Sequence, residues 1–103
     1  MVRHVILWKL KDGYSAAEKE KIKKEAKKAL EDLIDKVPSL MSIAVHVNPL
    51  ESSNCDMMLD SLFEDAVGLA EYANHPAHLL AADTFVCPYT ASRVCMDFTD
   101  EEL

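Results

Sequence analysis

Glycine is scarce in this chain of 103 residues, with Gly13 and Gly68 the only two. Loops that cradle phosphates need several glycines close together, because the backbone must approach the anion closely. The sequence therefore argues against a nucleotide cofactor held by a glycine-rich loop. Long apolar runs are also missing: no stretch approaches the ~20 residues of a membrane-spanning helix, so we expect no membrane partner. Charges flank the short apolar run near the amino terminus, which is interpreted as part of the folded domain and not as a signal peptide.

The three cysteines, Cys55, Cys87 and Cys95, are odd in number and form no C-x-x-C pair. Neither a disulfide framework nor a zinc site of that kind is predicted. Reduced thiols in a cytoplasmic protein are the simplest interpretation. Cys87 precedes Pro88 and is expected to be a small buried apolar side chain.

Basic residues are few in the second half of the chain. After Val47 the only lysine or arginine is Arg93, against eleven acidic residues, and the net charge of the whole chain is -7. An acidic surface repels phosphates, so we expect no nucleic-acid partner. Six lysines crowd residues 19–28, but Glu20 and Glu25 alternate with them. This mixture predicts a solvated helix face and not a phosphate-binding patch.

Hydrophobic periodicity predicts four strands and two helical regions. The strands are expected at residues 4–10, 41–47, 56–63 and 91–98, and the helices at residues 16–37, 64–75 and 76–87. A capping box formed by Ser15 and Glu18 precedes the first helix. Pro76 must interrupt the second helical region, and because proline suits a first helical position, a new helix is expected to begin there. The apolar stripe of the first helix comprises Ile22, Ala26, Ala29, Leu33 and Val37.

The order β-α-β-β-α-β is typical of the ferredoxin-like α+β fold, a four-stranded antiparallel sheet with helices on one face. We expect one domain over residues 1–98 and a solvated tail over residues 99–103. The strand residues on the face without helices include four that are apolar: Val5, Leu7, Met58 and Leu62. Such a face needs a cover, and a second copy packed sheet to sheet about 10 Å away supplies it. The sequence therefore predicts a homodimer.

The segment from Tyr72 to His78, YANHPAH, holds the densest group of reactive side chains. His75 and His78 are three apart, but Pro76 separates them and no H-E-x-x-H or similar spacing is present, so no metal site is predicted. No serine or cysteine lies in a nucleophile motif such as G-x-S-x-G. General acid–base chemistry remains, because histidine titrates near neutral pH and a tyrosine hydroxyl can stabilise an oxyanion.

Tyr72 and His78 are candidates for this chemistry, together with His4, which shares a strand face with Trp8. A structural interpretation stays open for each of them. His75 can cap a helix, His78 can bond a backbone carbonyl, and Tyr72 can be a core aromatic with its hydroxyl at the rim. His4 and Trp8 can likewise be ordinary core residues.

Three segments, HVILWKLKDG, YANHPAH and SRVCMDF, together resemble the stress-responsive dimeric α/β barrel (Dabb) domain family over residues 4–98. The resemblance implies a dimeric ferredoxin-like barrel. One plant member of that family is a polyketide cyclase that closes its product by an aldol reaction without a metal or an organic cofactor. The resemblance implies that the catalytic positions of that enzyme correspond to Tyr72, His78 and His4 in this chain. The residues expected to line an apolar pocket are Ile6, Trp8, Leu59, Phe63 and His75.

The resemblance leads to a functional expectation and two alternatives. We expect a homodimer with no cofactor that carries out acid–base chemistry on a small apolar or aromatic carbonyl compound. A non-catalytic protein on the same scaffold, binding a small ligand or linked to stress, is the first alternative. A relative of the barrel-type monooxygenases is the second.

Overall fold

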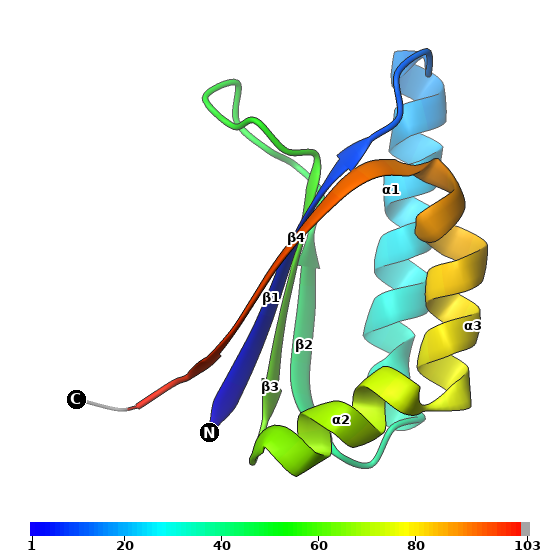
Figure 1. Ribbon diagram of the computed structural model, residues 1–103. Helices are drawn as coiled ribbons and strands as arrows, with labels where there is room; N and C mark the ends of the chain where they lie inside the picture. Colours follow the sequence, from blue (N-terminus) through cyan, green and yellow to red (C-terminus); the bar gives the residue numbers. More distant parts are fainter. Residues whose placement is uncertain (102–103) are drawn as a thin grey trace.

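The computed structural model describes residues 1–101 (Figure 1). The four strands are β1 (Val2–Leu10), β2 (Leu40–His46), β3 (Met57–Phe63) and β4 (Thr90–Thr99). The α-helices are α1 (Ala16–Glu31), α2 (Ala66–Asn74) and α3 (Pro76–Phe85), and the short 3₁₀ helices are η1 (Asp32–Asp35) and η2 (Cys87–Tyr89). None of the helices within these residues is long and apolar enough to cross a membrane. The predicted order of elements is confirmed.

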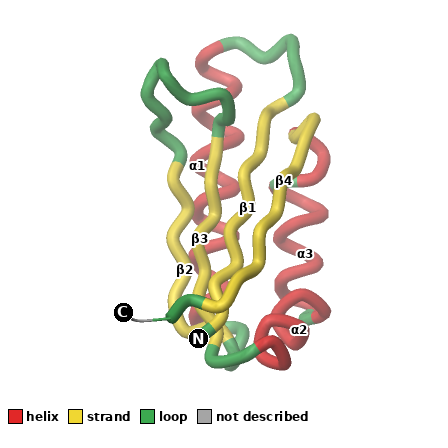
Figure 2. Tube along the Cα trace, turned by 60° about the vertical axis from the view of Figure 1, so that its left-hand side comes forward, coloured by secondary structure: helices red, strands yellow, loops and turns green. Residues whose placement is uncertain are grey.

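The strands form one antiparallel sheet in the order β2-β3-β1-β4. The α-helices all lie on one side of it, and the opposite side carries no helix (Figures 1 and 2). This arrangement confirms the ferredoxin-like α+β fold. Because β1 and β3 occupy the middle of the sheet, β4 is an edge strand on the side where α3 lies (Figure 2).

The helix-side face of the sheet forms the core. On β1, His4, Ile6, Trp8 and Leu10 are all buried, as the alternation predicted. On β3 the buried residues are Met57, Leu59, Ser61 and Phe63. Successive strand residues point to opposite faces, so one continuous apolar layer results on the side that the helices cover.

Helix α1 begins as predicted and ends differently. Ser15 accepts a hydrogen bond from the Glu18 N–H, and the Glu18 carboxylate accepts one from the Ser15 N–H, which completes the capping box. We expected one helix to about Val37, but the chain tightens into η1 at Asp32. The tighter turn keeps Leu33 and Val37 buried in the core before Pro38 ends helical structure.

The break between α2 and α3 has a local cause. His75 is extended, with φ -68° and ψ 133°, because the residue before a proline avoids helical geometry. Its N–H still closes the last turn of α2, on the Tyr72 carbonyl, at 3.1 Å. Its ring Nδ1 accepts from the Ala77 N–H at 3.0 Å and caps α3, which starts with Pro76 at its first turn. The break therefore places Tyr72 and His78 on two differently directed helices.

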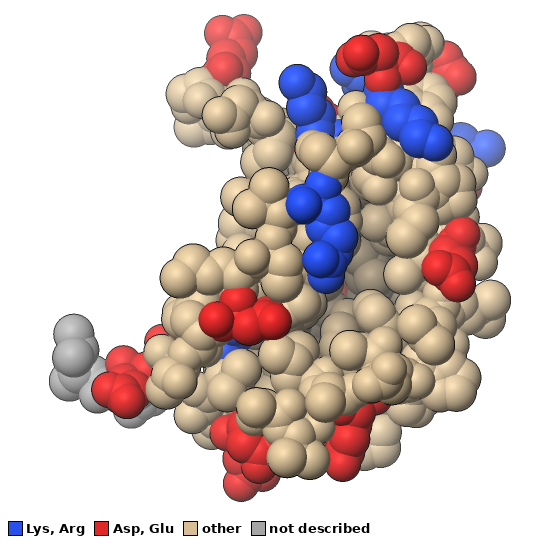
Figure 3. All heavy atoms as spheres, viewed as in Figure 1, with Lys and Arg blue, Asp and Glu red and all other residues tan. Residues whose placement is uncertain are grey.

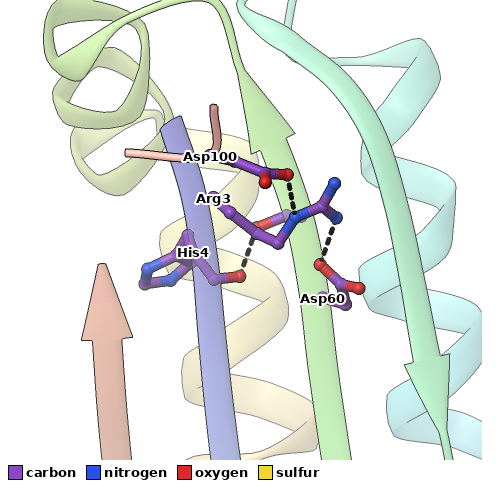
Figure 4. A network of polar contacts seen from close by, with 5 residues as sticks. Arg3, His4, Asp60 and Asp100 are labelled. Atoms are coloured by element: carbon purple, nitrogen blue, oxygen red, sulfur yellow. Dashed lines mark hydrogen bonds and ion pairs between the residues drawn. The ribbon is translucent and has the colours of Figure 1, made fainter. Parts of the chain in front are cut away.

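The outer face of the sheet is largely apolar, and no helix among residues 1–101 covers it. Val5 and Leu7 on β1 are half-buried, and they lie opposite Met96 and Val94 of β4 in the strand register. Val94 and Met96 are 62% and 64% exposed in the single chain. Arg3 lies at one end of this face, where it donates to Asp60 and Asp100 at 2.7 Å each; its side chain and that of His4 leave β1 on opposite sides (Figure 4).

Near the end of the chain, the structure differs from two expectations. Cys87 is exposed at the start of η2, so its predicted burial is wrong: the short turn into β4 carries its side chain away from the core. Of the expected tail, Thr99 belongs to β4 and Asp100 pairs with Arg3. Residues 102–103 of that tail lie outside the described residues.

Replacing each of the two glycines by alanine is expected to change the stability of the protein in opposite directions. Gly68 lies in the first turn of α2, and a Cβ there would make only ordinary contacts of 3.5–3.8 Å. Gly13 has φ +96°, a conformation that costs energy for any residue with a side chain. We expect Gly68→Ala to raise the free energy of unfolding by about 0.5–1 kcal/mol and Gly13→Ala to lower it by about 1 kcal/mol. Urea unfolding measures both changes. A rise in both variants, or a fall in both, would contradict this interpretation of the two glycines.

Candidate active site

Tyr72 lies at the centre of the candidate site. Helix α2 carries it against the sheet, where only 1% of the residue is exposed. Its ring centroid lies 4.4 Å from that of His78, 6.2 Å from that of His4 and 5.1 Å from that of Phe63. The structure thus brings together the three residues predicted to be catalytic, from β1, α2 and α3.

The Tyr72 side chain is a neutral hydrogen-bond donor. Burial raises the pKa of Tyr72 to about 12, so the group is a neutral phenol at physiological pH. Among residues 1–101, no buried side-chain nitrogen or oxygen lacks a hydrogen-bond partner. The Tyr72 side chain itself is only 1% exposed. Its hydroxyl is a hydrogen-bond donor at the edge of an apolar ring.

His78 has the properties of a neutral base. It lies half-buried in the first turn of α3, and its Nδ1 donates to the Ala73 carbonyl at 3.1 Å. This bond fixes the tautomer and leaves the lone pair of Nε2 free. Burial lowers the pKa of His78; the bond to Ala73 opposes this shift, and the charges of His4 and Arg93 add to it. The imidazole therefore stays unprotonated at neutral pH.

His4 is held by two residues of β4 that the sequence analysis did not select. Its Nδ1 is paired with the Asp97 carboxylate, directly opposite it in the strand register. The Cys95 thiol lies 3.7 Å from the same Nδ1 and donates to Asp97 at 3.5 Å. Burial raises the pKa of the Cys95 thiol, and the charge of Asp97 acts in the same direction. The period-two pattern of β4 already placed both residues on one face, but the strand register was needed to bring His4 to them.

This group is not a Cys–His–Asp catalytic triad. In such a triad the carboxylate binds one ring nitrogen of the histidine, and the other nitrogen takes the proton of the nucleophile. Here Cys95 and Asp97 both approach Nδ1 of His4. The raised pKa of the thiol also opposes formation of the thiolate at neutral pH.

The residues predicted to line a pocket are placed as follows. Ile6, Trp8, Leu59 and Phe63 are packed in the hydrophobic core, each at most 5% exposed. His75 caps α3. A groove of about 340 Å³ does occur, but it runs between α1 and α3 and includes Leu33 and Leu80, not Tyr72 or His78. At the β4 edge of the sheet, Arg93, Cys95 and Asp97 are exposed.

The lowered pKa of His78 predicts a pH dependence of stability. The folded state disfavours the charged ring, so neutral His78 contributes to the free energy of unfolding. This contribution is fully present above the ordinary pKa of 6.5 and is lost as pH falls through the lowered pKa of His78. We expect the NMR titration of His78 to have its midpoint below 6.5. Acidification below that pH should destabilise the wild type more than His78→Gln in urea unfolding. A midpoint above 6.5 would contradict this description of the ring.

The chain is a ferredoxin-like α+β domain with a tyrosine–histidine pair beside its sheet. Comparison with known proteins then gives the family. The chain belongs to the stress responsive A/B barrel (Dabb) domain family, whose profile matches residues 2–100. The resemblance found in the sequence is thus confirmed.

Solved structures support this assignment. A dimeric protein of unknown function with a ferredoxin-like fold from Bacteroides fragilis is 30% identical, with a TM-score of 0.88, and the match covers 94% of this chain and 93% of that one. A hydroxynitrile lyase from Passiflora edulis is 16% identical, with a TM-score of 0.74 and coverage of 99% and 94%. A putative antibiotic biosynthesis monooxygenase from Nitrosomonas europaea is 15% identical, with a TM-score of 0.74 and coverage of 97% and 98%. The last two share the fold; a comparison with curated proteins found no match.

Proposed function

We propose that this chain is an enzyme that moves a proton at a carbonyl compound by acid–base chemistry, without a cofactor. The observation that carries the proposal is the contact between Tyr72 and His78, with ring centroids 4.4 Å apart. One member of this pair is a phenol donor and the other a neutral base, and their rings are in contact. A base and an oxyanion donor placed together are the two groups that enolisation requires.

The reaction follows from these two groups. Nε2 of His78 removes the proton from the carbon next to the carbonyl, and the electron pair of that C–H bond forms the enolate. The Tyr72 hydroxyl donates a hydrogen bond to the enolate oxygen and keeps its own proton, which suits a pKa of about 12. The enolate carbon then attacks a second carbonyl, and protonated His78 returns its proton to the resulting alkoxide. His4 supports the tyrosine ring, with a ring-centroid distance of 6.2 Å.

Arg93 indicates the kind of substrate. It is the only lysine or arginine after Val47, and its register partner on β1 is Trp8, so it lies on the helix-side face. Its charge acts on His78. The view of Figure 3 shows basic side chains over the upper half of the face that β4 crosses and mainly acidic ones at the lower end. These features favour a small apolar or aromatic carbonyl compound that carries an anionic group.

The proposal includes a homodimer in the cytoplasm. A second copy on the outer face would cover Val5, Leu7, Val94 and Met96, which the helices leave bare. The relative from Bacteroides fragilis is itself described as dimeric. The three free thiols, Cys55, Cys87 and Cys95, suit a reducing compartment.

The test begins with a thermal-shift screen of small ketones and keto acids, because a ligand that binds the folded state raises the melting temperature. Hits are then incubated in D₂O, and deuterium at the carbon next to the carbonyl is followed by NMR. We expect the wild type to incorporate deuterium and His78→Gln to do so at least about 100-fold more slowly. Exchange at equal rates in both proteins would refute His78 as the base.

A non-catalytic binding protein is the second candidate. The core packing of Ile6, Trp8, Leu59 and Phe63 favours it, because little space is left between sheet and helices. In that case ligands would raise the melting temperature but no deuterium would enter them. The monooxygenase alternative is tested separately by titration with haem, where the absence of a Soret shift would dismiss a haem-dependent reaction.

A further inference from the structure

Three side chains with different metal-binding atoms meet at the β4 edge. His4 comes from β1, and Cys95 and Asp97 come from alternate positions of β4, all on the helix-side face of the sheet. Nδ1, Sγ and a carboxylate oxygen of these residues all lie within 4.8 Å of one another. His4 is buried, whereas Cys95 and Asp97 are exposed, so the group is anchored on one side and open on the other.

The spacing of these atoms fits tetrahedral coordination. Bonds of about 2.3 Å to sulfur and about 2.0–2.1 Å to nitrogen or oxygen place neighbouring ligand atoms about 3.5 Å apart around a tetrahedral zinc ion. The Cys95 Sγ lies 3.7 Å from His4 Nδ1 and 3.5 Å from Asp97 Oδ1. Two of the three distances between ligand atoms therefore need no adjustment. The third, between His4 and Asp97, is a direct contact that the ion would open, and the exposed Asp97 side chain is free to move.

We propose that His4, Cys95 and Asp97 form a binding site for a divalent cation of the zinc type, with the fourth position open to water or a ligand. Imidazole, thiolate and carboxylate are the three donors that zinc takes in proteins, and three protein ligands with one open position are typical of sites that act on a ligand. On binding, the Cys95 thiol proton passes to solvent, and His4 binds through Nδ1 as a neutral imidazole with its proton on Nε2. The thiolate and the carboxylate then balance the double charge of the ion.

This site shares His4 with the proposed catalytic group, but its ligands do not include Tyr72 or His78. A subunit docked on the outer face of the sheet covers Val94 and Met96, which point away from Cys95 and Asp97. Tyr72 touches the His4 ring with its edge and supplies no ligand, so metal binding does not depend on the enolisation chemistry. Tyr72→Phe removes the proposed oxyanion donor and leaves all three ligands in place.

The test uses Co²⁺ as a spectroscopic probe of the full chain under reducing conditions. We expect one Co²⁺ per subunit, an intense visible spectrum typical of tetrahedral coordination, and a thiolate-to-cobalt charge-transfer band in the near ultraviolet. Cys95→Ser should abolish the charge-transfer band, and Asp97→Asn should weaken zinc binding. Losing a ligand should cost at least about 100-fold in affinity, since losing a supporting contact already costs 10–100-fold.

Cys87→Ser is the matched control, because Cys87 is also an exposed free thiol but lies outside the group. It should retain the band and the affinity, as should Tyr72→Phe. Both ligand substitutions are at exposed positions, and circular dichroism confirms that the variants are folded. A band that survives Cys95→Ser, disappears in Cys87→Ser, or never forms in the wild type would overturn the proposal.

Discussion

A chain carrying both Val94→Lys and Met96→Lys is expected to be a folded monomer of about 11.5 kDa, whereas the wild type should be a dimer. Both side chains are more than 60% exposed in the single subunit, so lysine there disturbs little of its own core. In the dimer the substitutions place four charges between two apolar sheets. Burying unpaired charges is costly, and we expect the dissociation constant to rise at least about 1,000-fold, or about 4 kcal/mol.

The control for this experiment is Leu80→Lys. Leu80 is 69% exposed, like Val94 and Met96, but lies on α3 in the helix layer. It should leave the dimer intact. Sedimentation equilibrium over a range of concentrations measures both variants. Unchanged association of the double variant would show that the outer face is not the interface.

Removal of the Phe63 ring should destabilise the subunit by about 3–5 kcal/mol. Phe63 is fully buried at the end of β3, and its ring centroid lies 5.1 Å from that of Tyr72. Phe63→Ala leaves a cavity that the surrounding strands and α2 can fill only in part. Tyr72 loses the ring against which it is packed, so we also expect a weaker response to any ligand found by thermal shift.

Urea unfolding measures this loss, with Leu50→Ala as the control. Leu50 is 77% exposed in the loop between β2 and β3, and its truncation should change the free energy of unfolding by less than about 0.5 kcal/mol. A cost below about 1 kcal/mol for Phe63→Ala would mean that the centre of the core lies elsewhere.

Much of the fold could be predicted because period-two and helical patterns are local. The alternation of His4, Ile6 and Trp8 against Val5 and Leu7 was enough to separate a core face from an outer face. Pro76 fixed the break between helices, because its effect on the preceding residue does not depend on the rest of the chain. The early switch from α1 to η1 was not predicted, since it depends on how the helix end packs on the sheet.

The site could be predicted only in part. Tyr72 and His78 were found because they lie within one short segment. Cys95 and Asp97 were missed because their contact with His4 spans more than 90 residues and depends on the register between β1 and β4. A shift of that register by one residue would turn both side chains to the other face. Arg93 was noticed only as an isolated charge, and its place on the helix-side face, where its charge adds to the lowering of the pKa of His78 by burial, required the same register.

We propose that Tyr72 and His78 act as one catalytic unit. A double-mutant cycle measures it directly: the rate of deuterium incorporation into the best substrate is compared for wild type, Tyr72→Phe, His78→Gln and the double variant. Groups that serve one step are strongly non-additive, so we predict that each single variant loses at least about 100-fold and the double variant loses little more. Independent effects that multiply in the double variant, or single variants as fast as the wild type, would contradict the claim.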